Sequence, residues 1–387
     1  MPSPFLPEAD RAALQAHLVR WRRHLHQHPE VGLDLPDTVA YLRRELEGMG
    51  LTARECAGGL LVDLGPEGPR SAWRADMDGL ALQTGLEAPY ASCRPGAMHA
   101  CGHDAHMAVG LGLAWLLTRT PCPAPVRLVF QPGEEGCFGA RGMVEAGALE
   151  GVRRLFAVHV GALDERLQPG QFALRAGAQM AAGDRFRATF RGRGTHGAQP
   201  NLGRDPLPAA GAFLQLAQVI PARELAPGRL AVVTVGTLHA GSADNIIPES
   251  VELKAIVRTG HPDDRAHLKR RLQEAARGLA LAHDLQLDWT WIDGYPPVTN
   301  DPTMAALARA AVVKHFGRGS MLDLESPAAT SEDVSYFLQE VPGALLFMGT
   351  QDPARDITEP HHSPRFDVDE THLWKAVVLA ADLCLQA

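Results

Sequence analysis

The stretch Val126-Arg-Leu-Val-Phe-Gln-Pro-Gly-Glu-Glu135 holds the two features that decide the fold. Residues 126–130 predict a buried strand, and two adjacent carboxylates, Glu134 and Glu135, follow it across a short turn. Residues 155–160 repeat this arrangement, with His159 near the strand end. Apolar strands separated by helices predict a mainly parallel sheet covered by helices on both faces. Such sheets bind ligands beyond the carboxyl ends of their strands, where these polar side chains stand.

Two further segments bring polar residues to the same edge. Residues 70–74 predict a short strand that ends in Ala75-Asp-Met-Asp78. The stretch His99-Ala-Cys-Gly-His-Asp-Ala-His106 leads into a helix predicted over 105–119, whose apolar residues are spaced for one buried face. Asp104 is expected to cap the N-terminus of this helix.

The pattern changes near residue 183. Residues 185–191 alternate strictly, with Phe186 and Phe190 on the apolar face, which is typical of a strand wetted on one side. The predicted elements that follow are a helix, two strands, a helix and a strand, at 205–220, 230–238, 251–258, 262–282 and 285–292. This order is the ferredoxin-like layout. We therefore predict an α/β domain in two parts, 1–182 and 295–387, interrupted by an inserted α+β domain at 183–294.

Composition excludes several classes of function. A chain of 387 residues is too long for one ordinary domain, and its 45% hydrophobic and 21% charged content is that of a soluble globular protein. The formal charge of -8 argues against nucleic acid as a partner, because phosphate binding needs basic clusters. The densest basic run, residues 20–23, is expected to form a solvated helix face.

The sequence also carries signals of location. Residues 1–8 lack the apolar core of a signal peptide, and no run approaches the ~18 apolar residues of a membrane span. Six cysteines without regular spacing predict reduced thiols. We expect a cytoplasmic protein with no membrane partner.

Cys101 and His103 directly precede the predicted helix at 105–119. The helix dipole and the free amides there favour a thiolate, which together with imidazoles binds divalent metals well. An unligated buried cysteine is the plain alternative, but the density of ligand types within eight residues favours a metal. A closed structural zinc site is disfavoured, because no second pair of cysteines or histidines completes it.

The adjacent glutamates can divide two tasks. One carboxylate can bind a metal while the other takes the proton of an attacking water. A solvated acidic turn is the alternative for Glu134 and Glu135, and a satisfied core histidine is the alternative for His159. Their positions at the ends of buried strands favour the metal-site interpretation, whereas His361 and His362 lie in a polar turn with little local signal.

Three other polar residues have two open interpretations each. Asp78 and Asp76 could bind metal directly or orient ligand imidazoles, and we expect the orienting role for Asp78. For Asp76, a buried ion pair with Arg74 remains a fair alternative. His196 lies among glycines that permit close backbone approach, so it belongs either to a loop that enters a cleft or to a surface turn.

These motifs together resemble the aminoacylase and glutamate-carboxypeptidase family of two-metal amidohydrolases. Within that family they are most similar to the branch of hippurate hydrolase, indoleacetyl-amino-acid hydrolase and N-acetyl-diaminopimelate deacetylase. The resemblance implies a zinc-exopeptidase-like α/β domain and spans nearly the whole chain. It is carried by Arg74-Ala-Asp-Met-Asp78, Pro95-Gly-Ala-Met-His-Ala-Cys-Gly-His-Asp-Ala-His106, Phe130-Gln-Pro-Gly-Glu-Glu-Gly136, Gly194-Thr-His-Gly-Ala198, Asn245-Ile-Ile-Pro248, Ser331-Glu-Asp333 and His362-Ser-Pro364.

The resemblance implies roles for individual residues. Two divalent metal ions per subunit, zinc or manganese before cobalt or nickel, would be held by Cys101, His103, Glu135, His159 and His362, with Cys101 bridging. Glu134 would be the general base, and His196 would enter the partner subunit's site to stabilise an oxyanion. Asn245 and Arg258 would hold a substrate carboxylate. The neighbouring His361 leaves the assignment to His362 ambiguous.

The implied activity is hydrolysis of small N-acyl amino acids by a homodimer joined through the inserted domain. A metallo-dipeptidase or aminopeptidase is an alternative, because the same metals serve either reaction. A non-catalytic metal-binding protein of the same fold is a second alternative, which the complete set of ligands and base disfavours. A zinc nucleobase deaminase is disfavoured because the Pro-Cys-x-x-Cys motif is absent.

Overall fold

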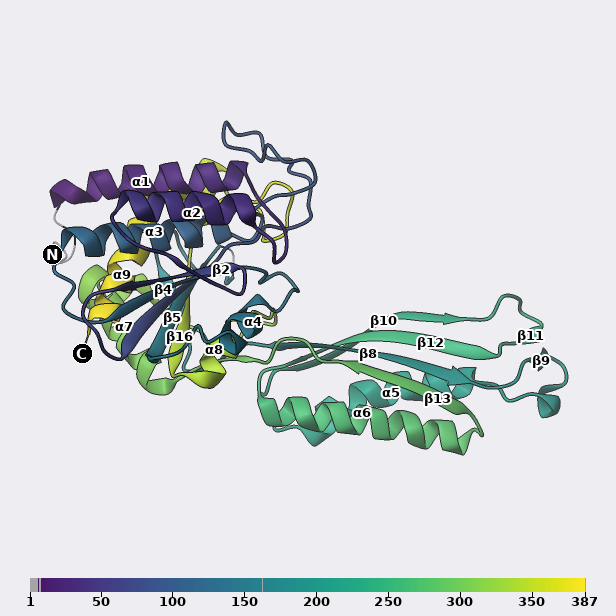
Figure 1. Ribbon diagram of the computed structural model, residues 1–387. Coiled ribbons are helices and arrows are strands. Elements are labelled where there is room, and N and C mark those ends of the chain that lie inside the picture. Colours follow the sequence, from purple (N-terminus) through teal and green to yellow (C-terminus); the bar gives the residue numbers. More distant parts are fainter. Residues whose placement is uncertain (1–5, 7, 162, 387) are drawn as a thin grey trace. The chain divides into compact units, whose positions relative to one another are not determined.

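The computed structural model describes residue 6, residues 8–161 and residues 163–386. The chain forms two compact units (Figure 1). The first comprises Met1–Gln179, Thr299–Glu325 and Asp333–Ala387, and the second comprises Met180–Val298 and Ser326–Glu332. The short segment Ser326–Glu332 therefore belongs to the second unit, although the first unit flanks it on both sides in the sequence.

A mixed sheet forms the centre of the first unit. Its strands are β1 (Arg54–Cys56), β2 (Gly59–Leu64), β3 (Arg70–Asp76), β4 (Val126–Gln131), β5 (Val152–Val160), β6 (Phe172–Leu174), β15 (Met321–Asp323) and β16 (Gly343–Met348). They lie in the order β1-β2-β4-β3-β5-β16-β6-β15, and the four central strands β4, β3, β5 and β16 run parallel. Antiparallel pairs join β1 to β2, β2 to β4 and β16 to β6. The predicted α/β class with a mainly parallel sheet is confirmed.

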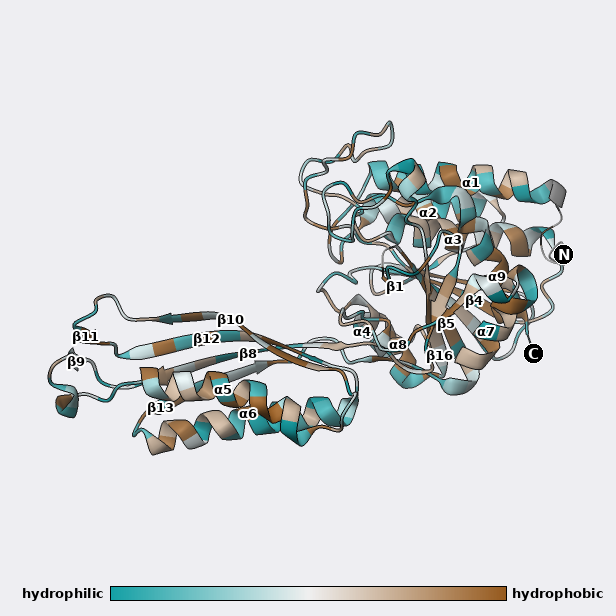
Figure 2. Ribbon diagram, turned by 180° about the vertical axis from the view of Figure 1, so that it is seen from behind, coloured by the Kyte–Doolittle hydropathy of each residue, from teal (hydrophilic) through white to brown (hydrophobic). Residues whose placement is uncertain are grey.

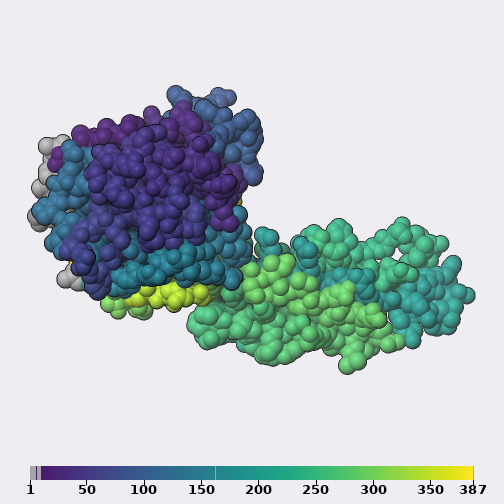
Figure 3. Space-filling model, viewed as in Figure 1, coloured from purple at the N-terminus to yellow at the C-terminus, as the bar shows by residue number. Residues whose placement is uncertain are grey.

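Helices cover both faces of this sheet. They are α1 (Glu8–Gln27), α2 (Pro36–Gly48), α3 (His103–Arg119), α4 (Gly139–Glu145), α7 (Pro302–Phe316), α8 (Ser335–Glu340) and α9 (Leu373–Leu385). On one face, α3 and α9 pack on β3, and α1 and α2 form an outer layer over α3 (Figure 1). The N-terminal residues, purple in the space-filling view, make up much of the visible surface of this unit (Figure 3). The hydrophobic colouring of β4, β5 and β16 is consistent with strands buried on both sides (Figure 2).

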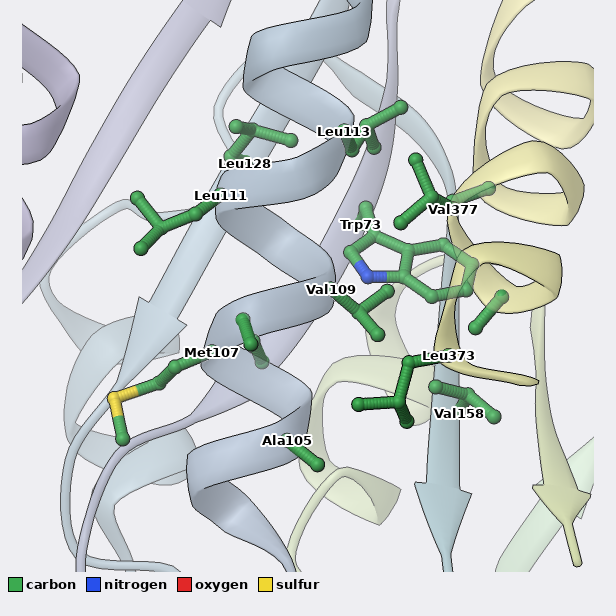
Figure 4. Close-up of a cluster of buried hydrophobic side chains, with 14 of the residues drawn as sticks. Trp73, Ala105, Met107, Val109, Leu111, Leu113, Leu128, Val158, Leu373 and Val377 are labelled. Atoms are coloured by element: carbon green, nitrogen blue, oxygen red, sulfur yellow. The ribbon is translucent and has the colours of Figure 1, made fainter. Parts of the chain in front are cut away.

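The helix α3 is buried almost all round, because it carries no charged residue between Asp104 and Arg119. Figure 4 shows its Val109 beside Trp73 of β3 and facing α9. Gly110 permits close approach of β4, since a Cβ there would stand 2.8 Å from the ring of Phe130. The tight packing fixes the helix, and with it the first turn that carries His103.

The second unit has the ferredoxin-like layout. Its elements in chain order are β8 (Ala182–Arg191), α5 (Leu207–Glu224), β10 (Ala231–Ala240), β12 (Ser250–Thr259), α6 (Pro262–Ala282) and β13 (Gln286–Ile292). The strands form an antiparallel sheet in the order β10-β12-β8-β13. Phe186 and Phe190 of β8 pack with Phe213 of α5 and with Leu268 and Leu272 of α6. The helices therefore cover one face, and the other face carries the polar residues of the alternating pattern.

The structure corrects two expectations from the sequence, one about the N-terminus of α3 and one about a basic run in α1. The helix begins at His103 rather than 105, after Gly102 in a left-handed conformation, so Asp104 lies inside the first turn and does not cap the helix. The basic run at 20–23 is only in part a solvated face: Arg20 and Arg23 are exposed, whereas Arg22 is fully buried and binds Asp104 at 2.8 Å and Asp367 at 2.6 Å. The helical period turns two of the four consecutive residues, Trp21 and Arg22, inward, which a count of charges cannot reveal.

Candidate metal centre

The predicted site residues of the first unit converge where the parallel strands end. Asp76 is the last residue of β3, Glu134 and Glu135 follow β4, and His159 lies one residue before the end of β5. Carboxyl ends of parallel strands share one edge of a sheet. The N-terminus of α3 begins at this edge with His103, which donates a hydrogen bond from Nδ1 to the main-chain oxygen of Asp78 at 2.8 Å.

The thiol of Cys101 belongs to two groups of possible ligands. Its sulfur and one ligand atom each of His103 and Glu135 lie within 4.8 Å of one another. The same sulfur forms a second group within 4.8 Å with His159 and His361, and it lies 3.6 Å from Nε2 of His159. A shared sulfur between two ligand groups is the arrangement that a bridging thiolate requires.

Hydrogen bonds to the main chain fix the tautomers of two histidines. His103 and His159 each direct Nδ1 at a carbonyl oxygen, that of Asp78 at 2.8 Å and that of Val160 at 3.0 Å. A carbonyl only accepts, so in the neutral rings Nδ1 carries the proton and Nε2 offers its lone pair. Nε2 of His103 is buried and has no hydrogen-bond partner among the described residues. This nitrogen lies 3.3 Å from Oδ2 of Asp76, and a buried imidazole nitrogen beside a carboxylate and a thiol fits a divalent metal ion.

Both histidines of the pair 361–362 reach the cluster, in different ways. Nε2 of His361 donates to the carbonyl oxygen of Val160 at 2.9 Å, and its ring lies 5.2 Å from that of His159. Nε2 of His362 lies 3.1 Å from Oε1 of Glu135, and this carboxylate raises the pKa of His362. The two residues therefore sit beside different members of the ligand groups.

Asp78 organises the turn that carries the two glutamates. Its carboxylate accepts hydrogen bonds from the main-chain N–H of Glu134 at 2.8 Å and of Glu135 at 3.0 Å. Its main-chain oxygen also accepts the bond from His103. One aspartate thus fixes three neighbouring residues, which is the geometry of an orienting residue.

Asp76 has both carboxylate oxygens engaged by protein groups. Arg74 donates to one at 2.9 Å and His106 to the other at 2.5 Å. Burial would raise the pKa of Asp76, but the Arg74 guanidinium and the nearby imidazoles hold it well below its ordinary value. His106 in turn accepts from the main-chain N–H of Val160 at 2.9 Å. The ion pair with Arg74, left open by the sequence, is present.

Burial of Cys101 acts against the thiolate that the sequence predicts. The sequence predicts a thiolate favoured by the helix N-terminus, whereas burial raises the pKa of this thiol well above its ordinary value in spite of nearby His103. Desolvation outweighs the helix dipole because the side chain is buried. A cation at the cluster would reverse the balance, since coordination deprotonates a thiol.

The candidate base Glu134 is buried and stands beside residues to which the sequence analysis gave no role at the site. Its Oε1 accepts a hydrogen bond from the main-chain N–H of Asp333 at 3.3 Å. The Asp333 carboxylate binds Gln131 at 2.8 Å and Arg74 at 3.1 Å. A glutamine at the end of a fully buried strand is the signal that could have revealed this network, because a buried amide needs partners.

In the second unit, the structure brings His196 and Asn245 together. His196 lies in β9 (Thr195–His196), which pairs with β11 (Ile246–Ile247), and the main-chain oxygen of Asn245 accepts from Gly197 at 2.7 Å. Both residues line a hollow of about 750 Å³. Nδ1 of His196 accepts from the main-chain N–H of Ala198 at 3.0 Å. In a neutral ring Nε2 therefore carries the proton and is free to donate it in a hydrogen bond.

Arg258 stands at the other end of the same unit. It pairs with Gly183 across β12 and β8, whereas Ser250, eight residues earlier, pairs with Arg191 at the end from which the chain continues to His196. At ~3.3 Å per residue these ends are about 26 Å apart. Within one chain, Arg258 and His196 are too distant to contact the same small molecule.

Comparison with known proteins identifies the family. A model of the peptidase family M20/M25/M40 matches residues 72–386. The chain belongs to this family. It is 35% identical over 371 residues to N-acetyl-L-cysteine deacetylase of Bacillus subtilis (strain 168), an alignment that covers 94% of this chain and 86% of the relative. It is 34% identical over 392 residues to IAA-amino acid hydrolase ILR1-like 5 of Arabidopsis thaliana, covering 99% of this chain and 89% of the relative.

Solved structures agree with this placement. The crystal structure of the Bacillus subtilis YXEP protein, described as a dinuclear metal binding peptidase from the M20 family, superposes with a TM-score of 0.83. The two sequences are 32% identical, and the match covers 97% of this chain and 98% of the other. A tripeptidase from Staphylococcus aureus shares the fold with a TM-score of 0.74 at 16% identity.

Proposed function

We propose that this M20-family protein hydrolyses the amide bond of N-acyl amino acids. Water adds to the acyl carbon, the C–N bond breaks, and a carboxylic acid and an amino acid are released. The observation that carries the proposal is the pair of largely buried ligand groups that share the Cys101 sulfur, with the buried carboxylate of Glu134 next to that of Glu135 in the chain. Relatives named as deacetylases and as IAA-amino acid hydrolases support an N-acyl amino acid as the substrate class.

Two divalent metal ions per subunit are the proposed cofactors. Cys101, His103, Glu135, His159 and His362 would hold them, with Cys101 shared between both. When bound, such ions polarise a carbonyl oxygen and lower the pKa of water toward neutrality. Imidazole and thiolate ligands suit zinc, cobalt or nickel, and carboxylates extend the choice to manganese. We propose zinc or manganese as the bound metal, ahead of cobalt or nickel.

The chain's own residues supply the proton transfers. Glu134 takes a proton from the attacking water and delivers one to the leaving amine, the tasks of a general base and acid. The Asp78 carboxylate accepts hydrogen bonds from the main-chain N–H groups of Glu134 and Glu135. These bonds keep the two glutamates side by side at the site. His196, protonated at Nε2, would donate to the oxyanion that forms on the acyl oxygen.

Substrate recognition and assembly are proposed together. Asn245 and Arg258 would hold the substrate carboxylate. Strand β12 spans about 26 Å between the end from which the chain continues to His196 and the end that carries Arg258, so both residues can serve one site only if a second copy supplies one of them. We therefore propose a homodimer formed through the second unit, with the partner's His196 completing each site.

The proposed location is the cytoplasm. The six cysteines are free, which fits a reducing compartment. Within the described part of the chain, no helix is long and apolar enough to cross a membrane. A small-molecule substrate and the acidic charge of -8 agree with a protein that binds no nucleic acid.

A substrate panel with Glu134→Ala as the matched variant tests the function. Wild-type protein loaded with each metal in turn should cleave acetyl-, benzoyl- or arylacetyl-amino acids faster than free dipeptides. Glu134→Ala should lower kcat by about 10³-fold, within the range for general acid–base groups, and still bind two metal ions. Faster cleavage of dipeptides would favour a peptidase, and retained turnover in Glu134→Ala would remove this residue as the base.

A further inference from the structure

The three residues Ser331-Glu332-Asp333 form one of the passages of the chain between the two units. Ser331 and Glu332 belong to the second unit, and Asp333 is the first residue back in the first unit. Each end of this tripeptide is bound, within its own unit, to a residue with a proposed catalytic or binding role. Two peptide bonds therefore separate the partner of the base from the partner of the substrate-binding arginine.

At the first-unit end, Asp333 is fully buried and firmly anchored. Its carboxylate accepts from Nε2 of Gln131 at 2.8 and 3.0 Å, from Arg74 at 3.1 Å and from the main-chain N–H of Ala140 at 2.9 Å. These groups belong to β3, β4 and α4, whose positions the core fixes. The main chain at residue 333 is held in place by its own side chain.

That anchored main chain touches the base directly. The N–H of Asp333 donates to Oε1 of Glu134 at 3.3 Å. The N–H of Glu134 is held by Asp78 at 2.8 Å, so the residue is restrained at its main chain by one aspartate and at its carboxylate by another. A shift of Asp333 would rotate the Glu134 carboxylate without displacing its Cα.

At the second-unit end, Ser331 contacts the substrate-binding arginine. The hydroxyl of Ser331 accepts from Nη1 of Arg258 at 2.9 Å. Gly183 allows this contact, because a Cβ there would lie 2.6 Å from Nη1 of Arg258 and 2.7 Å from the Ser331 hydroxyl. Burial and the neighbouring Arg185 lower the pKa of Arg258, so this guanidinium lies in a partly desolvated, cationic setting that favours an anion.

We propose that Ser331-Glu332-Asp333 couples carboxylate recognition at Arg258 to the orientation of Glu134, with Asp333 as a positioning residue for the base. An anion bound at Arg258 competes with the Ser331 hydroxyl for the guanidinium, and the displacement of Ser331 passes along two peptide bonds to the N–H that holds Glu134. The coupling rests on the roles proposed above for Glu134 and Arg258. It explains how recognition of the substrate carboxylate aligns a base that this carboxylate itself does not touch.

Asp333→Asn tests the first-unit end. The variant keeps the shape of the side chain but replaces one acceptor by a donor, so the anchor loosens. Because a misplacement of about 1 Å can cost up to about 10²-fold in rate, we expect kcat to fall at least about tenfold, with KM changed less than about twofold and two metal ions still bound. Asp382→Asn is the matched control, since Asp382 is a buried carboxylate paired with Lys314 of α7. It should lower the melting temperature and leave kcat unchanged.

Crystal structures of the metal-loaded wild type and Asp333→Asn supply a readout that does not depend on turnover. The Glu134 carboxylate should be rotated or displaced in the variant while the ligand residues coincide. An unmoved Glu134 together with an unchanged kcat would overturn the positioning role. If the wild type cleaves no N-acyl amino acid, the proposed function fails, and these two structures still decide whether Asp333 positions Glu134.

Ser331→Ala and Ser331→Thr test the coupling itself. In Ser331→Ala a bound anion has no hydroxyl to displace, so the signal that aligns Glu134 on binding is lost and kcat should fall about threefold to tenfold. Ser331→Thr, which keeps the hydroxyl, should restore most of it. In Asp333→Asn, adding Ser331→Ala should lower kcat no further, because both changes break the same path. A Ser331→Ala variant that raises KM alone, or effects that multiply in the double variant, would overturn the coupling.

Discussion

The two units hold their polar side chains in opposite ways. In the first, Cys101, His103 and His159 are buried, and both histidines are oriented by main-chain hydrogen bonds. In the second, His196 is exposed and Asn245 lines an open hollow beside it. The buried set is preorganised by its own chain, whereas the exposed set becomes desolvated only when something covers it. The difference fits the proposal of a metal site formed within one chain and a substrate site that a second copy completes.

Cys101→Ala should have the largest effect on the buried ligand residues and on metal binding. Because the sulfur belongs to both ligand groups, its loss should reduce bound metal to well under one ion per chain and abolish turnover. Metal content measured by atomic emission after dialysis checks this. Cys384→Ala is the control, since Cys384 is a buried thiol of α9 outside both groups, and it should keep two ions. Two ions retained by Cys101→Ala would contradict the shared ligand.

Arg22→Ala tests whether the buried ion network supports the first turn of α3. The change leaves the buried Asp104 carboxylate without its 2.8 Å partner, so the free energy of unfolding should fall by about 3–5 kcal/mol. The measurement is urea unfolding of the metal-free protein. Arg20→Ala on the same helix is the control, because the side chain of Arg20 is 54% exposed and its ion pair with Glu45 should contribute at most about 1 kcal/mol. Equal losses in both variants would refute the difference.

His196→Ala tests whether the exposed His196 of the second unit stabilises the oxyanion. Loss of one oxyanion donor should lower kcat by about 10²–10³-fold, with metal content unchanged. Subunit mixing shows which chain supplies the histidine. In a mixed dimer of Glu134→Ala and His196→Ala, one of the two sites has both residues intact, so a random mixture should regain about a quarter of wild-type activity. Activity that stays at the mean of the two separate variants would contradict a histidine supplied by the partner.

Much of the fold can be predicted from the sequence, because the spacing of apolar residues within each element and the order of the elements along the chain are read directly from it. The alternation in 185–191 places Phe186 and Phe190 in the core of the second unit, as the structure shows. The convergence of the polar residues near 76, 101, 134 and 159 also follows, since parallel strand ends share an edge. Contacts between distant segments do not follow. Gln131 and Asp333 lie 202 positions apart, and no local pattern links them.

Burial of charge was equally hidden from the sequence. The run at 20–23 gives no sign that Arg22 is turned inward, because the partners that satisfy it lie on α3 and near the C-terminus. The same holds for Cys101, whose pKa depends on the depth of its burial rather than on its place before a helix. In both cases desolvation is set by the tertiary structure, which a local stretch of sequence does not reveal.

Anomalous diffraction from crystals soaked in Mn²⁺ or Zn²⁺ tests the metal site most directly. Two peaks should flank the Cys101 sulfur, one also within bonding distance of His103 or Glu135 and the other of His159. A single peak, or two peaks that share no contact with this sulfur, would contradict the proposed two-metal centre.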